Sequence, residues 1–470
     1  MASELEQGKT AESVYARQNG GEAPVKAKSR VPGMFRAMQY RNYRLFFGGQ
    51  IISLVGTWMQ STAQSWLVYR LTGSSLLLGL VGFAGQIPVF LLASVGGMVA
   101  DRRSRYRIVI ATQTSAMLLA FVFSALVLMT HIKVWEIMVV ASLLGLVNAF
   151  DIPARQSFIV EMVGQQDLIN AIALNSSMVN GARILGPAVA GIMLAAIGEG
   201  WCFFANGVSY IAVIAGLLLM TVKPRERSNE RSGLGSMAEG FRWVAHAGPI
   251  RALLLLLGLV SLTGMPYVVL MPIFADRILH SGPRGLGILM GAAGVGALMG
   301  TLTLAARHGV RGLGRWVMYA SGGFGTALIL FSMSHSFWLS VLLVVPAGFS
   351  MILQMAATNT MIQTMVPDEL RGRVMAVYSM MFMGMAPFGA LLSGAVAHHV
   401  GAPLTVRLGG IICLAGCAVF AMTWPGLRGE ARQLIVAQSL VGGEPVEEMT
   451  GQTVAIGRDV SVDTSKSGRG

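Results

Sequence analysis

Two charged side chains within long apolar stretches are the first candidates for chemistry in this sequence. Arg183 lies near the middle of such a stretch, where inserting a guanidinium into a membrane costs roughly 2.5 to 3.5 kcal/mol. It must face water or a partner, either as an anion-attracting or coupling residue of a pathway or as a structural tie to backbone carbonyls or to Asp151. Asp151 is itself a candidate proton carrier, and the alternative is a charge network with Arg102 or Arg105.

Polar side chains form a second candidate feature, a stripe along one apolar segment. Its members recur every three or four residues and so share one helix face: Gln50, Ser53, Thr57, Gln60 and Gln64. An amide that faces lipid would lack hydrogen-bond partners, so this face lines a cavity or packs against another helix. Polar residues of other apolar segments are candidates to complete the same pathway: Asn148, Tyr267, Gln354, Thr358 and Tyr378.

Tyr378 belongs to a methionine-rich helix face that also contains Met375, Met381 and Met385. Flexible thioethers suit a surface that accepts varied apolar ligands, and they serve equally well as core fillers. The sequence has no phosphate-binding loop of the Walker type, and its histidines lack the spacing and companions of a metal site. We therefore expect neither an enzyme nor an ATP-driven pump, and no cofactor or metal.

The elements that carry these residues follow from composition. Of 470 residues, 54% are hydrophobic and only 12% are charged, about half the charged fraction of an ordinary soluble domain. A soluble chain of this size could not keep so much apolar surface away from water. Several apolar runs exceed the roughly 18 residues that span a bilayer core. The sequence therefore predicts an all-α integral membrane protein.

Charged residues and Gly/Pro turns divide the apolar sequence into twelve predicted transmembrane helices. They cover residues 45–69, 75–99, 107–130, 134–158, 169–197, 201–222, 251–275, 285–306, 315–333, 337–364, 374–398 and 403–424. Equal span counts and weak internal similarity favour two pseudo-symmetric six-helix halves. The predicted units are a cytoplasmic N-terminal tail (1–44), a six-helix half (45–222), a cytoplasmic linker (223–250), a second half (251–424) and a cytoplasmic tail (425–470) that we expect to be disordered.

The formal net charge of +13 reflects membrane topology, so we expect no nucleic-acid partner. With these spans, 29 of the 35 Lys and Arg residues fall on the side of the two termini. Short translocated loops disfavour basic residues, which predicts that both termini are cytoplasmic. The basic residues there would meet anionic lipid head groups.

The loop after the second span contains Gly97, Asp101, Arg102 and Arg105, and it resembles the loop signature of the major facilitator superfamily. In such a loop the glycine lets two helices approach closely, the aspartate pairs with a neighbouring helix end, and the arginines bridge to acids of other spans. Ser104 stands where the family usually has Gly. The resemblance implies a twelve-helix fold in which two halves rock about a central site, so that the site opens to each side in turn.

Two further segments narrow the resemblance. Gly186 and Pro187 in the fifth span look like the Gly-Pro motif of the superfamily's antiporters, although a merely structural Gly/Pro cluster is the alternative. The run from Asp151 to Phe158, together with residues 170–175, 181–187 and 370–374, resembles the enterobactin-exporter-like branch. Members of that branch export siderophores or amphipathic drugs.

The resemblance thus implies a secondary active exporter of a small amphipathic molecule, driven by proton antiport, in the inner (plasma) membrane of a bacterium. We expect it to work as a monomer. An uptake symporter of the same fold and a non-transporting membrane sensor are the alternatives. Proton coupling is the least supported step, because the spans contain no carboxylate at mid-depth. A proton would have to use Asp151, Asp276 or a group on the substrate.

Overall fold

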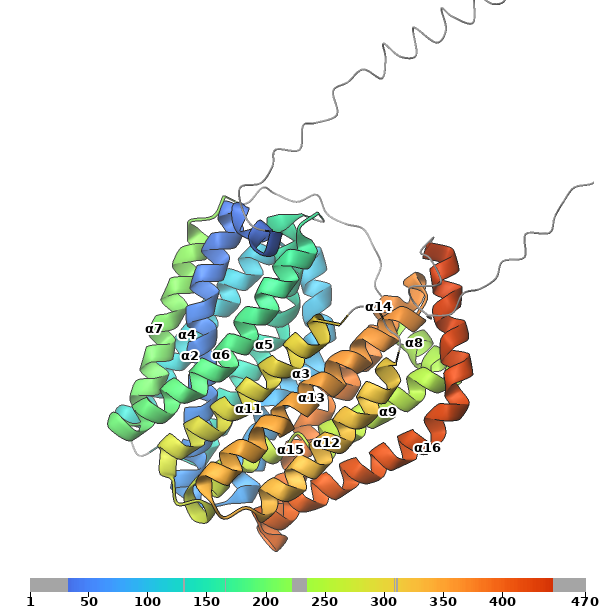
Figure 1. Ribbon diagram of the computed structural model, residues 1–470. Coiled ribbons are helices and arrows are strands. Elements are labelled where there is room, and N and C mark those ends of the chain that lie inside the picture. Colours follow the sequence, from blue (N-terminus) through green and yellow to red (C-terminus); the bar gives the residue numbers. More distant parts are fainter. Residues whose placement is uncertain are drawn as a thin grey trace, which may run out of the picture.

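Helices account for all regular secondary structure in the part of the chain that the structure describes. The computed structural model describes residues 33–129, 132–164, 166–221, 235–307, 309 and 312–442. Within these ranges, twelve long helical segments cross the molecule in two groups, coloured blue to green and yellow-green to red in Figure 1. This arrangement confirms the predicted all-α, twelve-helix architecture.

The N-terminal half consists of six uninterrupted helices that follow a short 3-10 helix, η1 (Gly33–Gln39). They are α2 (Arg41–Thr72), α3 (Ser75–Arg102), α4 (Arg105–Met129), α5 (Val134–Val163), α6 (Leu168–Ala196) and α7 (Glu199–Leu218). α2 packs against α6 and α7, α3 packs against α5, and α4 packs against α5 and α7.

The C-terminal half has six spans, of which two are interrupted. The first combines α9 (Gly248–Thr263), α10 (Tyr267–Ile273) and the π-helix η2 (Phe274–Ile278), and the fifth combines α14 (Asp368–Phe382) and α15 (Met385–Val400). The others are α11 (Gly282–Ala305), α12 (Leu313–Met333), α13 (Phe337–Met365) and α16 (Ala402–Gly442). α9 packs against α15 and α16, α11 against α13, and α12 against α13 and α16. These pairings repeat those of the first half, so the two halves are pseudo-symmetric.

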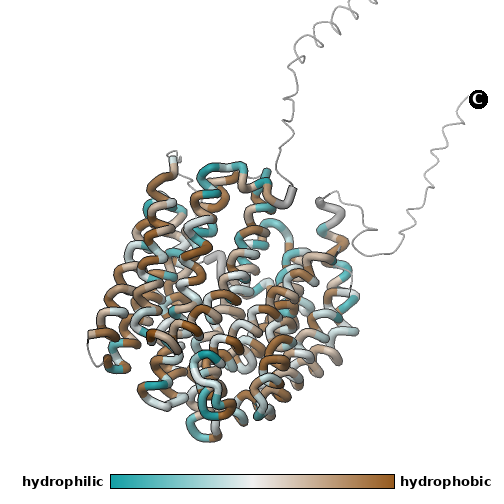
Figure 2. The backbone as a smooth tube through the Cα atoms, turned by 60° about the vertical axis from the view of Figure 1, so that its left-hand side comes forward, coloured by the Kyte–Doolittle hydropathy of each residue, from teal (hydrophilic) through white to brown (hydrophobic). Residues whose placement is uncertain are grey.

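Hydropathy identifies eleven of the twelve segments as long and apolar enough to cross a membrane. The twelfth, α2, has 32 residues, and its polar stripe lowers the mean hydropathy. In Figure 2 hydrophobic residues run along the helices, while hydrophilic residues gather towards the helix ends and loops. The chain is therefore a multi-pass membrane protein.

The C-terminal tail differs from the prediction. α16 continues to Gly442, so the expectation of disorder is wrong for residues 425–442. Ala431 is buried, Leu434 packs against the core, and Glu430 accepts a 3.1 Å hydrogen bond from the backbone N–H of Gly248 at the start of α9. These contacts stabilise the extra turns. Residues 443–470 lie outside the described residues, as do residues 1–32.

The predicted linker is also partly helical. It contains α8 (Gly235–His246), which packs against α9 and α14. Glu239 forms a 2.7 Å ion pair with Arg373 of α14, and Val244 is buried. This part of the linker is therefore attached to the C-terminal half, while residues 222–234 lie outside the described residues.

Glycines allow the two halves to touch through two helix pairs, α6 with α11 and α3 with α15. A Cβ atom added to Gly287 of α11 would lie 2.5 Å from the carbonyl oxygen of Pro187 in α6. One added to Gly79 of α3 would lie 2.5 Å from the carbonyl oxygen of Ala390 in α15. No side chain fits at such distances, and small residues are the usual solution where membrane helices approach closely.

These contacts lie towards one end of the bundle. We call it the distal end, where α2 and α15 finish, and we call the opposite end, where α2 begins and α16 finishes, the terminal end. The two halves diverge towards the terminal end (Figure 1). There α14 packs against α8, α9 and α13 of its own half. The contacts between the halves through α6–α11 and α3–α15 therefore lie at the distal end, and the helices of the two halves diverge towards the terminal end.

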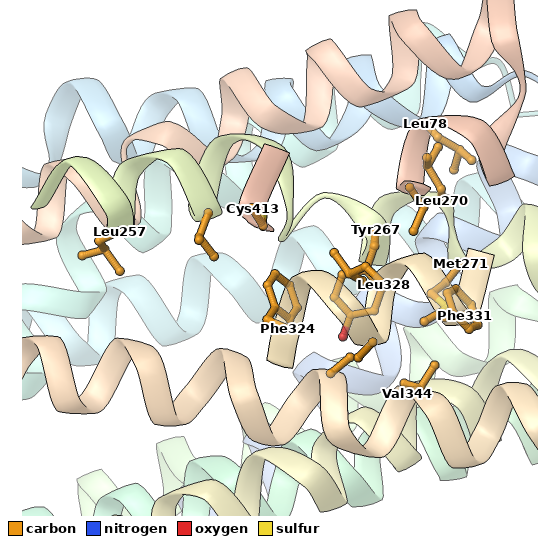
Figure 3. Packing of buried hydrophobic residues seen from close by; sticks show 14 of the residues in the cluster. Leu78, Leu257, Tyr267, Leu270, Met271, Phe324, Leu328, Phe331, Val344 and Cys413 are labelled. Carbon is orange, nitrogen blue, oxygen red and sulfur yellow. The ribbon is translucent and has the colours of Figure 1, made fainter. Parts of the chain in front are cut away.

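A buried hydrophobic cluster with members in both halves surrounds α10. It includes Tyr267, Phe324, Leu328 and Val344, which Figure 3 shows from close by. The rings of Tyr267 and Phe324 meet edge to face with centroids 6.1 Å apart, an arrangement that aromatic pairs favour. This packing places Tyr267 at the interface with the other half.

Candidate functional site

A cavity of about 270 Å³ lies between the two halves. Its lining is mostly apolar and includes the aromatic residue Trp58 and the methionines Met265, Met290 and Met351. Its polar and charged lining residues are Gln86 of α3, Arg183 of α6, Ser261 of α9 and Tyr267 of α10. Both halves thus contribute a wall, and each wall carries polar groups. Among the described residues no group of three His, Cys, Asp or Glu could hold a metal ion.

Arg183 is the one charged residue among those that line the cavity. Its Nε and Nη1 atoms are buried and have no hydrogen-bond partner among the described residues. Its guanidinium carbon lies 5.1 Å from the centre of the Trp58 ring. A desolvated cation–π contact contributes about 2 kcal/mol, whereas burying an ion costs several kcal/mol. The contact with Trp58 therefore offsets only part of the cost.

The Gly-Pro motif of α6 holds Arg183 at the border between the halves. Pro187 has no N–H, so the carbonyl of Arg183 loses its intrahelical hydrogen bond. That carbonyl faces α11, where a Cβ atom added to Gly294 would lie 3.1 Å from its oxygen. On the other side, a Cβ atom added to Gly186 would lie 2.4 Å from the Cβ atom of Trp58. The motif thus lets α6 approach α2 and α11 at the same level.

Tyr267 begins α10, just after the interruption that separates it from α9. Pro266 cannot donate a hydrogen bond, and the N–H of Tyr267 bonds to the carbonyl of Gly264 at 3.3 Å. The hydroxyl of Ser261, just before this interruption, donates a hydrogen bond to the carbonyl of Phe382 at the end of α14. The two interrupted spans of the C-terminal half are therefore tied together beside the cavity.

The polar stripe of α2 packs against α7 rather than lining this cavity. The side-chain oxygen of Gln60 accepts a 2.6 Å hydrogen bond from Asn206, and the hydroxyl of Thr57 lies 3.4 Å from that of Tyr210. The remaining members are buried or half-buried: Gln50, Ser53 and Gln64. Gln60 and Thr57 thus meet polar groups of α7 within the N-terminal half, whereas Oε1 of Gln50 is buried without a hydrogen-bond partner among the described residues.

The other polar candidates also lie outside the cavity lining. Gln354 and Thr358 are buried in α13, where Nε2 of the first and Oγ1 of the second have no hydrogen-bond partner among the described residues. Tyr378 of α14 donates a 3.1 Å hydrogen bond to the carbonyl of Met355. Asn148 of α5 is exposed. Of the predicted pathway residues, Arg183 and Tyr267 line this cavity.

The loop motif forms a charge network at the terminal end. Arg105 donates hydrogen bonds of 3.2 Å to both Asp101 and Glu161, and a third to the carbonyl of Ser157. These contacts attach the loop between α3 and α4 to α5. Arg102 is exposed.

The glycine that permits close packing in this region is Gly96 rather than Gly97. A Cβ atom added to Gly96 would lie 2.1 Å from the carbonyl oxygen of Ala149 in α5, whereas one added to Gly97 would find its nearest neighbour 4.0 Å away. The expected role of Gly97 in a close approach is therefore wrong by one residue. One residue along a helix turns the side-chain direction by about 100°.

Asp151 belongs to a charge network, although not with the arginines of the loop motif. Its carboxylate accepts hydrogen bonds from Thr112 at 2.7 Å and Gln113 at 2.9 Å, and it forms a 3.2 Å ion pair with Arg155. The predicted partners are thus wrong, because the arginine one turn later on the same helix is closer. The tie between Asp151 and Arg183 is not formed either.

Asp167 is an acid that the sequence did not single out. It forms a 3.2 Å ion pair with Arg36 and accepts hydrogen bonds from Gln39 at 2.8 Å and Tyr40 at 2.9 Å. Burial raises the pKa of Tyr40, and the neighbouring carboxylate raises it further. This cluster fastens η1 to the start of α6.

Trp58, Gln86 and Ser261 also line the cavity, and none of them was predicted to do so. Gln86 carried a usable signal, since it is an amide in an otherwise apolar span, like the members of the stripe. Trp58 and Ser261 carried none, because aromatic and small hydroxyl residues are common on every face of a membrane helix.

Residues 33–448 match the sequence profile of the transmembrane secretion effector family. The chain belongs to this family of major facilitator transporters. It is therefore a transporter and not an enzyme.

Members of the superfamily with known roles share about a quarter of the sequence. The staphyloferrin A transporter of Staphylococcus aureus is 26% identical over 381 residues, which cover 80% of this chain and 95% of that protein. The enterobactin exporter of Escherichia coli is 25% identical over 358 residues, covering 75% and 84%. The multidrug efflux pump Tap of Mycolicibacterium fortuitum is 25% identical over 359 residues, covering 74% and 87%. The predicted membership of the superfamily and of its enterobactin-exporter-like branch is confirmed.

Solved transporters share the fold at lower identity. An inward-facing, unoccupied bacterial homologue of the human lysosomal transporter Spinster superposes with a TM-score of 0.62 at 15% identity, covering 85% of this chain and 98% of that structure. The nucleoside transporter NupG gives 0.64 at 15% identity, covering 82% and 98%.

Proposed function

We propose that this protein is a secondary active exporter of a small amphipathic molecule, siderophore-like or drug-like, that works by alternating access. The observation that carries the proposal is the cavity between the halves, which combines an apolar lining with the guanidinium of Arg183, whose Nε and Nη1 have no hydrogen-bond partner among the described residues. The named siderophore and drug transporters among the relatives support this substrate class.

The proposal of export includes an orientation in the membrane. We propose that both termini lie in the cytoplasm of a bacterium, that the protein works as a monomer in the inner membrane, and that basic residues at the terminal end meet anionic lipids. In this orientation the halves diverge on the cytoplasmic side, an arrangement from which an exporter would load its substrate and through which an importer also passes. Uptake by symport is the second candidate, since the same fold supports both directions.

Proton influx is the proposed driving force, and Asp151 is the proposed carrier. Its carboxylate is buried and shares an ion pair with Arg155, so protonation would release the arginine and change the packing of α5. The test is Asp151→Asn in proteoliposomes with an imposed pH gradient, with the exposed Asp368→Asn as control. We expect the first variant to lose gradient-driven accumulation while keeping downhill flux. Full coupled transport in this variant would exclude Asp151.

Export itself is tested by comparing cells that lack the gene with cells that overexpress it, in iron-starved and drug-treated cultures. We expect the substrate to accumulate inside cells without the protein and to appear in the medium of overexpressing cells. The opposite pattern would support uptake. Purified protein that moves no such compound across vesicles would support the sensor alternative.

A further inference from the structure

The environment of Arg183 specifies a chemical group that its ligand must carry. The residues that line the cavity include no Asp or Glu. Asp151 is held by Thr112, Gln113 and Arg155, and Asp276 accepts a hydrogen bond from Tyr69. Asp151 and Asp276 therefore both have other partners. Nε and Nη1 of Arg183 are buried and have no hydrogen-bond partner among the described residues.

We propose that the transported molecule carries a planar oxyanion, such as a carboxylate, which pairs with Arg183 in the cavity. A guanidinium matches carboxylates in shape and donor number, and an ion pair removed from water is stronger than one at a surface. The inference rests on the proposed transport function, because it names the class of molecule that this site would carry.

The other residues that line the cavity indicate what the rest of the ligand would be. Trp58 lies against the guanidinium, and the methionines of the lining offer flexible, polarizable contacts. Gln86 is exposed in the lining of the same cavity and can donate an amide N–H to the ligand. An aromatic or aliphatic body attached to the anionic group would fit this surface.

Size limits how much of the ligand the cavity surrounds. About 270 Å³ lies just below the roughly 300 to 1,000 Å³ of pockets that enclose drug-sized ligands. The cavity therefore accommodates the anionic group with one ring or a short chain. The rest of a larger molecule would extend towards the terminal end, where the halves diverge.

The position of Arg183 makes the pairing relevant to transport. Arg183 lies on α6, which packs against α11 of the other half. Tyr267 of α10 lines the same cavity from the C-terminal half. A ligand that pairs with Arg183 and fills the cavity would thus contact both halves at once. Binding that involves both halves can favour one of their arrangements over the other.

The test compares a carboxylate with its neutral isostere on the full-length protein. Binding of 2-naphthoate and 2-naphthamide is measured by equilibrium dialysis for the wild type, Arg183→Gln and Arg183→Lys. We expect the wild type to bind naphthoate about tenfold or more tightly than naphthamide, the contribution of a buried charged hydrogen bond. Arg183→Gln should lose this preference and still bind naphthamide, which shows that it folds. Arg183→Lys should keep part of the preference.

A control substitution separates the local effect from net charge. Arg315→Gln removes one exposed arginine at the start of α12, outside the cavity lining, and should leave the preference unchanged. Equal affinities for acid and amide in the wild type, an unchanged preference in Arg183→Gln, or no binding of naphthoate at about 1 mM would overturn the inference.

Transport of the same probes into proteoliposomes distinguishes this inference from the proposed function. Preferential binding of naphthoate without flux of either probe would leave the anion site standing and remove the support for transport. Equal flux of both probes that is insensitive to Arg183→Gln would leave transport standing and contradict the anion site.

Discussion

The hydroxyl of Tyr69 in α2 donates a 2.8 Å hydrogen bond to the carboxylate of Asp276 in η2. This bond joins the two halves at the distal end, where the guanidinium of Arg277 also lies 5.8 Å from the centre of the Tyr69 ring. It adds to the glycine contacts of α6 with α11 and α3 with α15. Alternating access requires that these contacts separate, so they are the place where the balance of states can be altered.

Removing the distal hydrogen bond should shift that balance. Tyr69→Phe deletes one interaction of about 0.5 to 1.5 kcal/mol, so the population open at the terminal end should fall by about twofold to tenfold relative to its alternative. Distances between spin labels on the exposed residues Ser176 and Ser379 would measure the two populations by pulsed electron paramagnetic resonance. Tyr319→Phe, at an exposed tyrosine of α12, is the control. An unchanged distance distribution in Tyr69→Phe would show that the bond does not affect the balance.

A side chain at the contact between α6 and α11 should destabilise the structure. Gly287→Ala places a Cβ atom 2.5 Å from the carbonyl oxygen of Pro187, and such overpacking costs about 1 to 3 kcal/mol. Thermal unfolding of the purified protein in detergent should show the loss. Gly181→Ala has open space and should be neutral or slightly stabilising, because alanine favours helices. Equal unfolding temperatures for the two variants would contradict the close contact.

The hydrogen bond between Ser261 and Phe382 should couple the two interrupted spans. Ser261→Ala removes the donor and leaves a carbonyl without its side-chain partner at the end of α14. We expect slower transport, by about twofold to tenfold, with binding affinity changed much less, because an interaction of this kind contributes about 1 kcal/mol. Rates and affinities in proteoliposomes give this comparison. Ser393→Ala, which breaks only a contact within α15, should leave both values near those of the wild type.

The loop network predicts unequal effects at two nearby arginines. Arg105→Ala removes hydrogen bonds to Asp101, Glu161 and the carbonyl of Ser157, which should cost about 1 to 3 kcal/mol of stability because the side chain is largely buried. Arg102→Ala changes an exposed side chain and should stay within about 0.5 kcal/mol of the wild type. Thermal unfolding measures both, and a larger loss for Arg102→Ala would reverse the assignment.

Helix positions were predictable from the sequence because a bilayer imposes a minimum length on apolar segments. All twelve predicted spans overlap the observed helical segments. The errors fall at the ends, where helices continue into water: α16 extends to Gly442 because Ala431 and Leu434 find apolar neighbours. Hydropathy measures preference for the membrane and carries no information about such contacts.

The use of each polar residue was less predictable. The pattern of the α2 stripe was compatible with lining a cavity and with packing against another helix. Asn206 and Tyr210 of α7 lie beside Gln60 and Thr57, and the sequence could not predict this. Similarly, the sequence offered several arginines as partners of Asp151, and in the structure the carboxylate forms its ion pair with Arg155. Helix periodicity gives the face on which a residue lies but not the neighbour that covers it.

The sequence by itself determined the membrane class, the twelve spans and the superfamily, and it singled out Arg183 as a candidate, because each follows from local composition or a short motif. Only the tertiary structure decided that Arg183 lies beside Trp58 with Nε and Nη1 unpartnered among the described residues, that the halves meet at the distal end, and that the two interrupted spans are linked. These properties depend on distances between residues far apart in the chain, and those distances are fixed by how helices pack against one another rather than by which helices form.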